Sequence, residues 1–148
     1  GKQVAFMRIA ASSRAFSFGP VRDAEPWSIR VADVATGAGR QVWKADKGPG
    51  SAFSPIVGDS QVMWAEGGNL VFPWEKTGWK HLYKVSIRGD RAVELTNGKC
   101  EVEHASLSGN GSRVLWSSNC GDIDRRHIGA TKIADNSQEQ VTKGSGLE

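Results

Sequence analysis

The chain has 148 residues, enough for one domain with a sizeable apolar core. Its 19 basic and 16 acidic residues give a formal net charge of +3, and they are interspersed instead of forming blocks, which argues against a nucleic-acid-binding protein. No apolar run approaches the roughly 18 residues that a membrane-spanning helix requires. We therefore expect neither nucleic acid nor a membrane span.

Three short segments of the sequence resemble one another: residues 27–33, 81–87 and 127–133. Each is preceded by an apolar strand and followed by a turn and another short strand, and no stretch shows the 3.6-residue apolar period of a helix. The unit recurs about every 50 residues, which is a repeat length typical of β-propeller blades. The preceding apolar strands are 4–7, 62–65 and 114–117.

We therefore predict an all-β fold, a partial β-propeller of about three four-stranded antiparallel blades in residues 1–45, 51–97 and 101–143. Strands of a blade are lettered A to D outward from the central channel. The first blade is expected to lack strand A, because Gly1 aligns with a turn glycine, Gly111.

In the middle blade, the pattern assigns strand A to 51–57 and strand B to 61–65, with a further extended piece at 70–74. In the last blade, strands A to D fall at 102–107, 113–118, 127–133 and 139–142. Residues 144–148 look like a junction to an affinity tag. Because a propeller ring typically takes four to eight blades, the open edges are expected to favour self-association.

Two stretches carry a resemblance to a known family. Residues 74–83, Trp-Glu-Lys-Thr-Gly-Trp-Lys-His-Leu-Tyr, resemble a Ser-Glu-Arg-Asp-Gly-Trp-x-His-Leu-Tyr segment in propellers of the prolyl oligopeptidase family, especially its bacterial dipeptidyl peptidase IV-like members. Residues 117–128 are similar to a blade of those propellers that reads Glu-Arg-His-Leu-Tyr. The chain departs from this pattern at Gly129 and Ala130, where an aromatic residue is expected, and this should thin the packing of strand C.

The resemblance implies a non-catalytic propeller segment of a serine peptidase that hydrolyses short peptides. Such a segment would filter substrate access and dock an α/β-hydrolase domain outside this chain, alongside the missing blades. The chain has no Gly-x-Ser-x-Gly nucleophile elbow, so we expect no catalytic residue within it. Its His and Cys residues lack metal-ligand spacing, so no metal or other cofactor is expected.

Two other functions remain open. The turn at 108–114, Ser-Gly-Asn-Gly-Ser-Arg-Val, is similar to the turns of Tol-type propeller repeats. The alternative is therefore a Tol-like propeller that binds a protein or peptide without catalysis. A glycan-binding or glycan-processing propeller would need clustered acidic residues near the channel, where only Glu101 and Glu103 qualify.

Several residues are candidates for a substrate gate or an interface. Glu101 and Glu103 share one face of a strand, and His104 lies on a strand that should line the channel. The loop between strands B and C of the last blade carries four charged side chains. It is either an internal salt-bridge cluster or a charged rim at the substrate entrance. The same two interpretations apply to two residues on the equivalent loop of the middle blade. These loop residues are Asp122, Asp124, Arg125 and Arg126, and then Trp74 and Glu75.

Two cysteines offer a geometric test. If Leu107 pairs with Val114 across the hairpin, Cys100 and Cys120 lie within one residue of register and could form a disulfide. A disulfide would indicate a periplasmic or secreted protein, whereas free thiols would be equally compatible with the cytoplasm.

Overall fold

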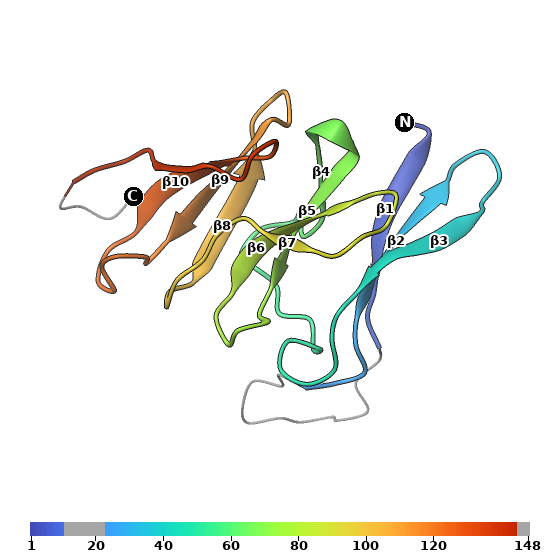
Figure 1. Ribbon diagram of the computed structural model, residues 1–148, viewed down its shortest axis with the longest axis horizontal. Helices are drawn as coiled ribbons and strands as arrows, with labels where there is room; N and C mark the ends of the chain where they lie inside the picture. Colours follow the sequence, from blue (N-terminus) through green and yellow to red (C-terminus); the bar gives the residue numbers. More distant parts are fainter. Residues whose placement is uncertain (11–22, 145–148) are drawn as a thin grey trace.

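The computed structural model describes residues 1–10 and 23–144. In these residues, three antiparallel sheets lie side by side in chain order (Figure 1). The first has the order β1-β2-β3, the second β4-β5-β6-β7, and the third β11-β10-β9-β8. The strands are β1 (Gln3–Arg8), β2 (Ser28–Asp33), β3 (Gly39–Lys44), β4 (Met63–Ala65), β5 (Asn69–Trp74), β6 (His81–Ser86), β7 (Val93–Glu94), β8 (Val102–Leu107), β9 (Arg113–Ser118), β10 (His127–Lys132) and β11 (Gln138–Gln140).

This architecture confirms the predicted fold class, an all-β partial propeller with three blades. The first sheet has three strands and the other two have four. One 3-10 turn, η1 (Glu66–Gly68), joins β4 to β5. Within the described residues, no helix has the length and apolar character needed to cross a membrane.

The strand assignment for the middle blade was wrong. Residues 51–57 are not part of its sheet; β4 is the innermost strand, and β5, the segment expected to be a further extended piece, lies second. The apolar residues of 51–57 misled the prediction because Phe53 and Ile56 contact the core from a connecting segment. At the end of that segment, Val57 forms a single parallel bridge with His104 of the third blade.

Aromatic rings fill the interface between the first and second blades. Trp27 and Trp43 of the first blade meet edge to face with their centroids 4.8 Å apart, and Trp43 makes a similar contact with Trp74 of the second. Such pairs contribute about 0.5–1.5 kcal/mol beyond their buried area. The carbonyl of Gly50, in the connecting segment, accepts hydrogen bonds from the indole N–H groups of Trp27 (3.3 Å) and Trp74 (2.9 Å). One main-chain oxygen therefore links the two blades.

The interface between the second and third blades is aliphatic and contains a buried polar chain. The Trp116 indole N–H donates to the Thr131 hydroxyl at 2.9 Å, and this hydroxyl donates to the carbonyl of Leu95 at 3.1 Å. Around this chain lie the buried side chains of Ile56, Met63, Ala65, Val71, Leu82, Leu95, Val102, Val114 and Ile133. The polar chain satisfies groups that would otherwise be buried without partners.

The expected thinning of strand C at Gly129 does not occur. Gly129 lies directly opposite Trp116 on β9, and the indole of Trp116 fills the space that a side chain would take at position 129. The third blade therefore keeps all four strands.

Candidate functional site

The innermost strands of the second and third blades, β4 and β8, border a hollow of about 570 Å³. This volume lies within the range of small-ligand sites. Trp64 of β4 is one of the lining residues, and Asp59 supplies the one charged group of the lining. The other lining residues are Gly58, Ser60, Val62, Met63, Ala105, Ser106 and Leu107.

A β-bulge at Glu103 shapes the start of β8. His104 pairs with Ser117 on β9, but Val102 pairs with Ser118, so Glu103 is the extra residue. The Glu103 carbonyl points to the free side of β8, where it accepts the N–H of Val57 at 2.9 Å. The bulge therefore connects the third blade to the segment that leads into the second.

The Glu103 side chain holds the loop after β9. Its Oε2 accepts a hydrogen bond from Nε of Arg126 at 3.0 Å, and its Oε1 lies 2.9 Å from Nη2 of the same guanidinium. This ion pair is about one-third exposed, and the hydrogen bond to Glu103 raises the pKa of Arg126. Arg126 also donates from Nη1 to the carbonyl of Ile123 at 3.0 Å, so one guanidinium fixes both the loop and its distance from β8.

A second ion pair lies within the same loop. Asp122 and Arg125 are 3.3 Å apart, and the Asp122 carboxylate accepts the backbone N–H of Asp124 at 3.0 Å. The loop thereby presents Ile123, 75% exposed, at its tip. Of the four predicted charges, Arg126 reaches the neighbouring strand while Asp122 and Arg125 pair internally.

The other predicted site residues are dispersed. His104 is exposed on β8 beside Val57, whereas the backbone N–H of Glu101 donates to the Asn119 side chain at 2.7 Å. Trp74 is buried in the first interface and so belongs to the core instead of a rim. Glu75, which follows it, is half-buried.

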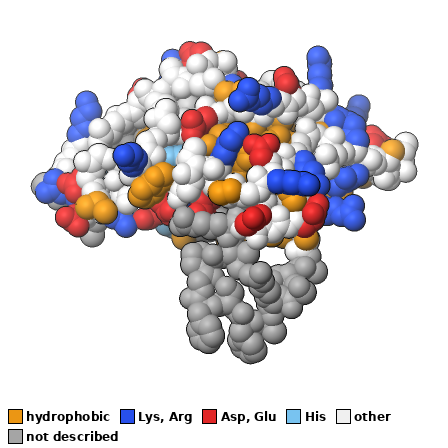
Figure 2. Space-filling model, turned by 60° about the horizontal axis from the view of Figure 1, so that its bottom comes forward, with side chains coloured by type: hydrophobic (Ala, Val, Ile, Leu, Met, Phe, Trp, Pro, Cys, Tyr) orange, Lys and Arg blue, Asp and Glu red, His pale blue; other side chains and the backbone are white. Residues whose placement is uncertain are grey.

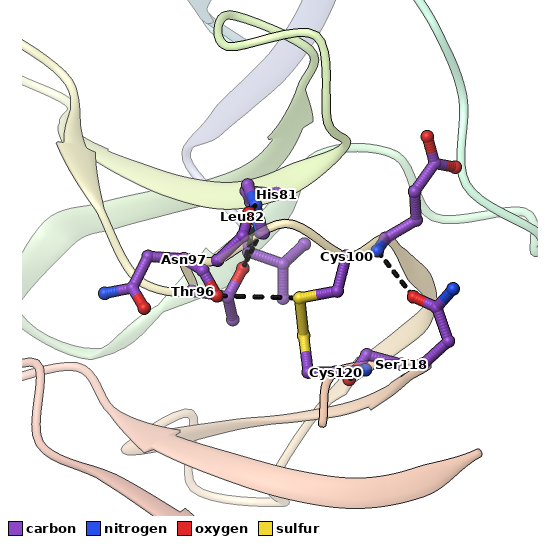
Figure 3. The surroundings of a disulfide bond; sticks show 10 residues. His81, Leu82, Thr96, Asn97, Cys100, Ser118 and Cys120 are labelled. Carbon is purple, nitrogen blue, oxygen red and sulfur yellow. Dashed lines mark hydrogen bonds between the residues drawn. A yellow bond between two sulfur atoms is a disulfide. The ribbon is translucent and has the colours of Figure 1, made fainter. Parts of the chain in front are cut away.

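Cys100 and Cys120 are joined by a disulfide, with their Cα atoms 4.9 Å apart (Figure 3). The bulge at Glu103 shifts the register by one residue and thereby brings the two cysteines opposite each other. The Cys100 end of this crosslink adjoins the connection from the second blade. There, the buried His81 ring contacts the Thr96 hydroxyl through Nδ1 (3.2 Å) and the Gly98 carbonyl through Nε2 (2.9 Å).

The repeat pattern contained little indication of the hollow. Trp64 falls within the segment expected to form strand B, and Asp59 lies between the two expected strands; that both line one hollow follows from the true strand order. Charged side chains elsewhere are intermixed on the face shown in Figure 2. Among the described residues, no group of three or more His, Cys, Asp or Glu side chains could hold a metal ion.

Comparison with known proteins supports the fold. No protein-family model matches the chain, and no curated protein matches it. Among solved structures, TolB from Acinetobacter baumannii matches 99% of the chain (TM-score 0.57, 16% identity). Dipeptidyl peptidase 4 from Porphyromonas gingivalis matches 81% of the chain (TM-score 0.59, 16% identity). An oligogalacturonate lyase in complex with manganese matches 95% of the chain (TM-score 0.66, 11% identity).

These neighbours share a propeller-like fold with the chain and differ in function. The chain spans only 31%, 16% and 38% of their respective lengths. At such identities the likeness concerns the fold alone, because one propeller scaffold carries unrelated functions.

Proposed function

We propose that this chain is a non-catalytic propeller segment of a serine peptidase, in which it filters substrate access and docks a hydrolase domain. The observation that carries the proposal is the stretch 74–83. It resembles peptidase propellers in sequence, and it forms the end of β5 and the start of β6, where Trp74, His81 and Tyr83 anchor the second blade. The fold match to a dipeptidyl peptidase is consistent with this proposal.

In this proposal the loop after β9 forms part of the gate. The Glu103–Arg126 pair holds it beside the channel strand, and Ile123 at its tip is available to contact another domain. The disulfide suits an oxidising compartment, so we infer a periplasmic or secreted protein. Further blades would complete the ring, and without them the chain would self-associate through its open edges.

The full-length gene product provides the test. A fluorophosphonate probe, which labels activated serines, should label the full-length protein and leave the 148-residue segment unlabelled. The full-length protein should also hydrolyse short peptides and spare folded proteins. Arg126→Ala should relax this size limit, whereas Lys44→Ala, which removes an exposed ion pair with Glu25 in the first blade, should not. A full-length protein without a reactive serine would contradict the proposal.

That result would favour the second candidate, a Tol-like binding propeller. The observation in its favour is the match to TolB, which extends over 99% of the chain. Such a protein would bind a protein or peptide without hydrolysing it.

A further inference from the structure

A separate pocket lies on the outer face of the first blade. The first sheet is at one end of the row of three sheets (Figure 1), and its residues Ala5 and Met7 pack into the core that it shares with the second blade. On the opposite face, the end of β1 and the start of β2 border a pocket of about 350 Å³. This volume lies within the range of small-ligand sites.

The strand register places two arginines side by side in this pocket. Arg8 pairs with Ser28 and Phe6 pairs with Arg30, so Arg8 and Arg30 are diagonal neighbours on one face of the sheet, and both line the pocket. Among the described residues, neither guanidinium has a hydrogen-bond or ion-pair partner. Two neighbouring cations repel each other, and an anionic group between them would be attracted by both.

The other two charges of the lining cancel each other. Lys44 and Glu25 both line the pocket, and they form an ion pair with each other at 3.1 Å. The pocket therefore keeps the positive charges of Arg8 and Arg30. A guanidinium donates through a planar fork of N–H groups that matches the two oxygens of a carboxylate.

The Ser28 hydroxyl supplies a further donor. Ser28 is only 4% exposed, yet its hydroxyl has no hydrogen-bond partner in the described part of the chain. Ser28 lines the pocket, and its pairing with Arg8 puts both side chains on the same face of the sheet. The hydroxyl can therefore donate to an oxygen atom that is bound beside Arg8.

The two arginines are not a feature of the blade repeat. Arg8 is the last residue of β1, and Arg30 is the third residue of β2. The other blades carry uncharged residues at these two places, which are Trp74 and Tyr83 in the second blade and Ser118 and Gly129 in the third. The first blade thus departs from the repeat at the two positions that give the pocket its charge.

We propose that this pocket binds a small organic acid, with its carboxylate between Arg8 and Arg30 and accepting a hydrogen bond from the Ser28 hydroxyl. The apolar part of the acid would lie against Ile9, which is 49% exposed, and Pro26, both of which line the pocket. The pocket is on the face of the first blade that points away from the second. The proposal therefore does not depend on the peptidase assignment.

An NMR titration of the isotope-labelled 148-residue chain tests the ligand class. The probes are isocaproate, its uncharged amide isocaproamide, and acetate. Isocaproate should shift the backbone amide signal of Ser28 and the Nε–H signals of Arg8 and Arg30 saturably. Isocaproamide should bind at least tenfold more weakly because it lacks the charge, and acetate at least fivefold more weakly because it lacks the apolar part. Equal affinity for isocaproate and either of the other probes would overturn the proposal.

Substitutions test the three donors. Arg8→Gln and Arg30→Gln should each weaken isocaproate binding at least tenfold, and Ser28→Ala about fivefold. The matched control is Arg40→Gln, which should leave binding unchanged. Arg40 is exposed on β3 opposite the buried Val31 and so lies on the other face of the sheet. Because the Ser28 hydroxyl has no partner in the fold, Ser28→Ala should keep the wild-type urea midpoint; a lower midpoint with unchanged affinity would show that the hydroxyl serves the fold and not a ligand.

The full-length protein shows whether the pocket stays open. It should bind isocaproate with the same affinity as the 148-residue chain. Binding to the 148-residue chain alone would overturn the proposal, because a neighbouring blade would then fill the pocket. None of these outcomes bears on labelling by the fluorophosphonate probe, so the peptidase proposal would stand or fall separately.

Discussion

The indole of Trp116 covers Gly129 on the adjacent strand so closely that a Cβ at position 129 would lie 2.3 Å from two ring carbons. The same indole donates its N–H to Thr131 and so starts the polar chain that reaches the second blade. The contact with Gly129 and the hydrogen bond to Thr131 together hold the Trp116 ring in place. A side chain at position 129 would displace this ring.

We expect Gly129→Ala to lower the free energy of unfolding by about 2–3 kcal/mol, because the new methyl group overpacks this site. Urea denaturation monitored by circular dichroism measures the change. Gly109→Ala is the control, since a Cβ there meets nothing within 4 Å. Combining Gly129→Ala with Trp116→Leu should cost less than the sum of the two single changes. Strict additivity would show that the two residues do not compete for space.

The disulfide should contribute about 3 kcal/mol to stability, since it closes a loop with a sequence separation of 20. Replacing both Cys100 and Cys120 by Ser should lower the urea midpoint accordingly, and dithiothreitol should do the same to the wild type. The double-serine variant serves as the control, because the reductant should not affect it. Two free thiols per denatured, unreduced chain in a thiol assay would contradict the crosslink.

Thr96→Val should destabilise the second blade. The Thr96 hydroxyl accepts the N–H of Leu82 at 2.9 Å and contacts Nδ1 of His81, and all three residues are buried. Removing it leaves buried polar groups without partners, at about 1–3 kcal/mol for each. Thr142→Val is the comparison. The Thr142 hydroxyl accepts the N–H of Ile128 in the third blade at 2.9 Å, but Thr142 is only half-buried. Loss of this hydroxyl should therefore lower the free energy of unfolding by less than loss of the Thr96 hydroxyl. Equal effects in thermal denaturation would refute this account.

The single tyrosine gives a clean pH prediction. Burial, and then the charge and hydrogen bond of Glu94, raise the pKa of Tyr83 well above its ordinary value of 10.0. The folded state thus favours the neutral phenol, and the stability this provides is present below pH 10 and is lost as the pH rises through the raised pKa. Absorbance at 295 nm should show no tyrosinate near pH 10 until the chain unfolds. In Glu94→Gln the phenol should ionise at lower pH, and an unchanged titration would exclude a role for Glu94.

Local signals predicted much of the fold, while the identity of the inner strands depended on long-range contacts. The Asn110–Gly111 turn correctly placed β8 and β9, because Gly111, with φ of 71°, needs the left-handed conformation. The segment 51–57 has the composition of a strand but is a connection whose apolar side chains contact the core. Sequence alone cannot distinguish these two uses of an apolar residue.

The candidate site was less predictable for the same reason. The register deduced from Leu107 and Val114 is correct, yet it leaves the cysteines one residue apart; the bulge at Glu103 removes this offset, and nothing local marks it. The Glu103–Arg126 pair joins residues far apart in sequence, so their relation depends on how the loop folds back. The hollow beside Trp64 depends on which strand is innermost, and that could not be deduced from the repeat.

The carbonyl of Gly50 has a consequence for how this fold can evolve. A main-chain oxygen is present whatever side chain occupies its position, so the acceptor shared by Trp27 and Trp74 cannot be lost by a point mutation. Replacing one tryptophan would therefore leave the acceptor of the other in place. The glycine has no such freedom, because a Cβ there would lie 2.9 Å from both the Glu75 carbonyl and the Trp74 indole nitrogen. Position 50 should therefore remain glycine in homologues.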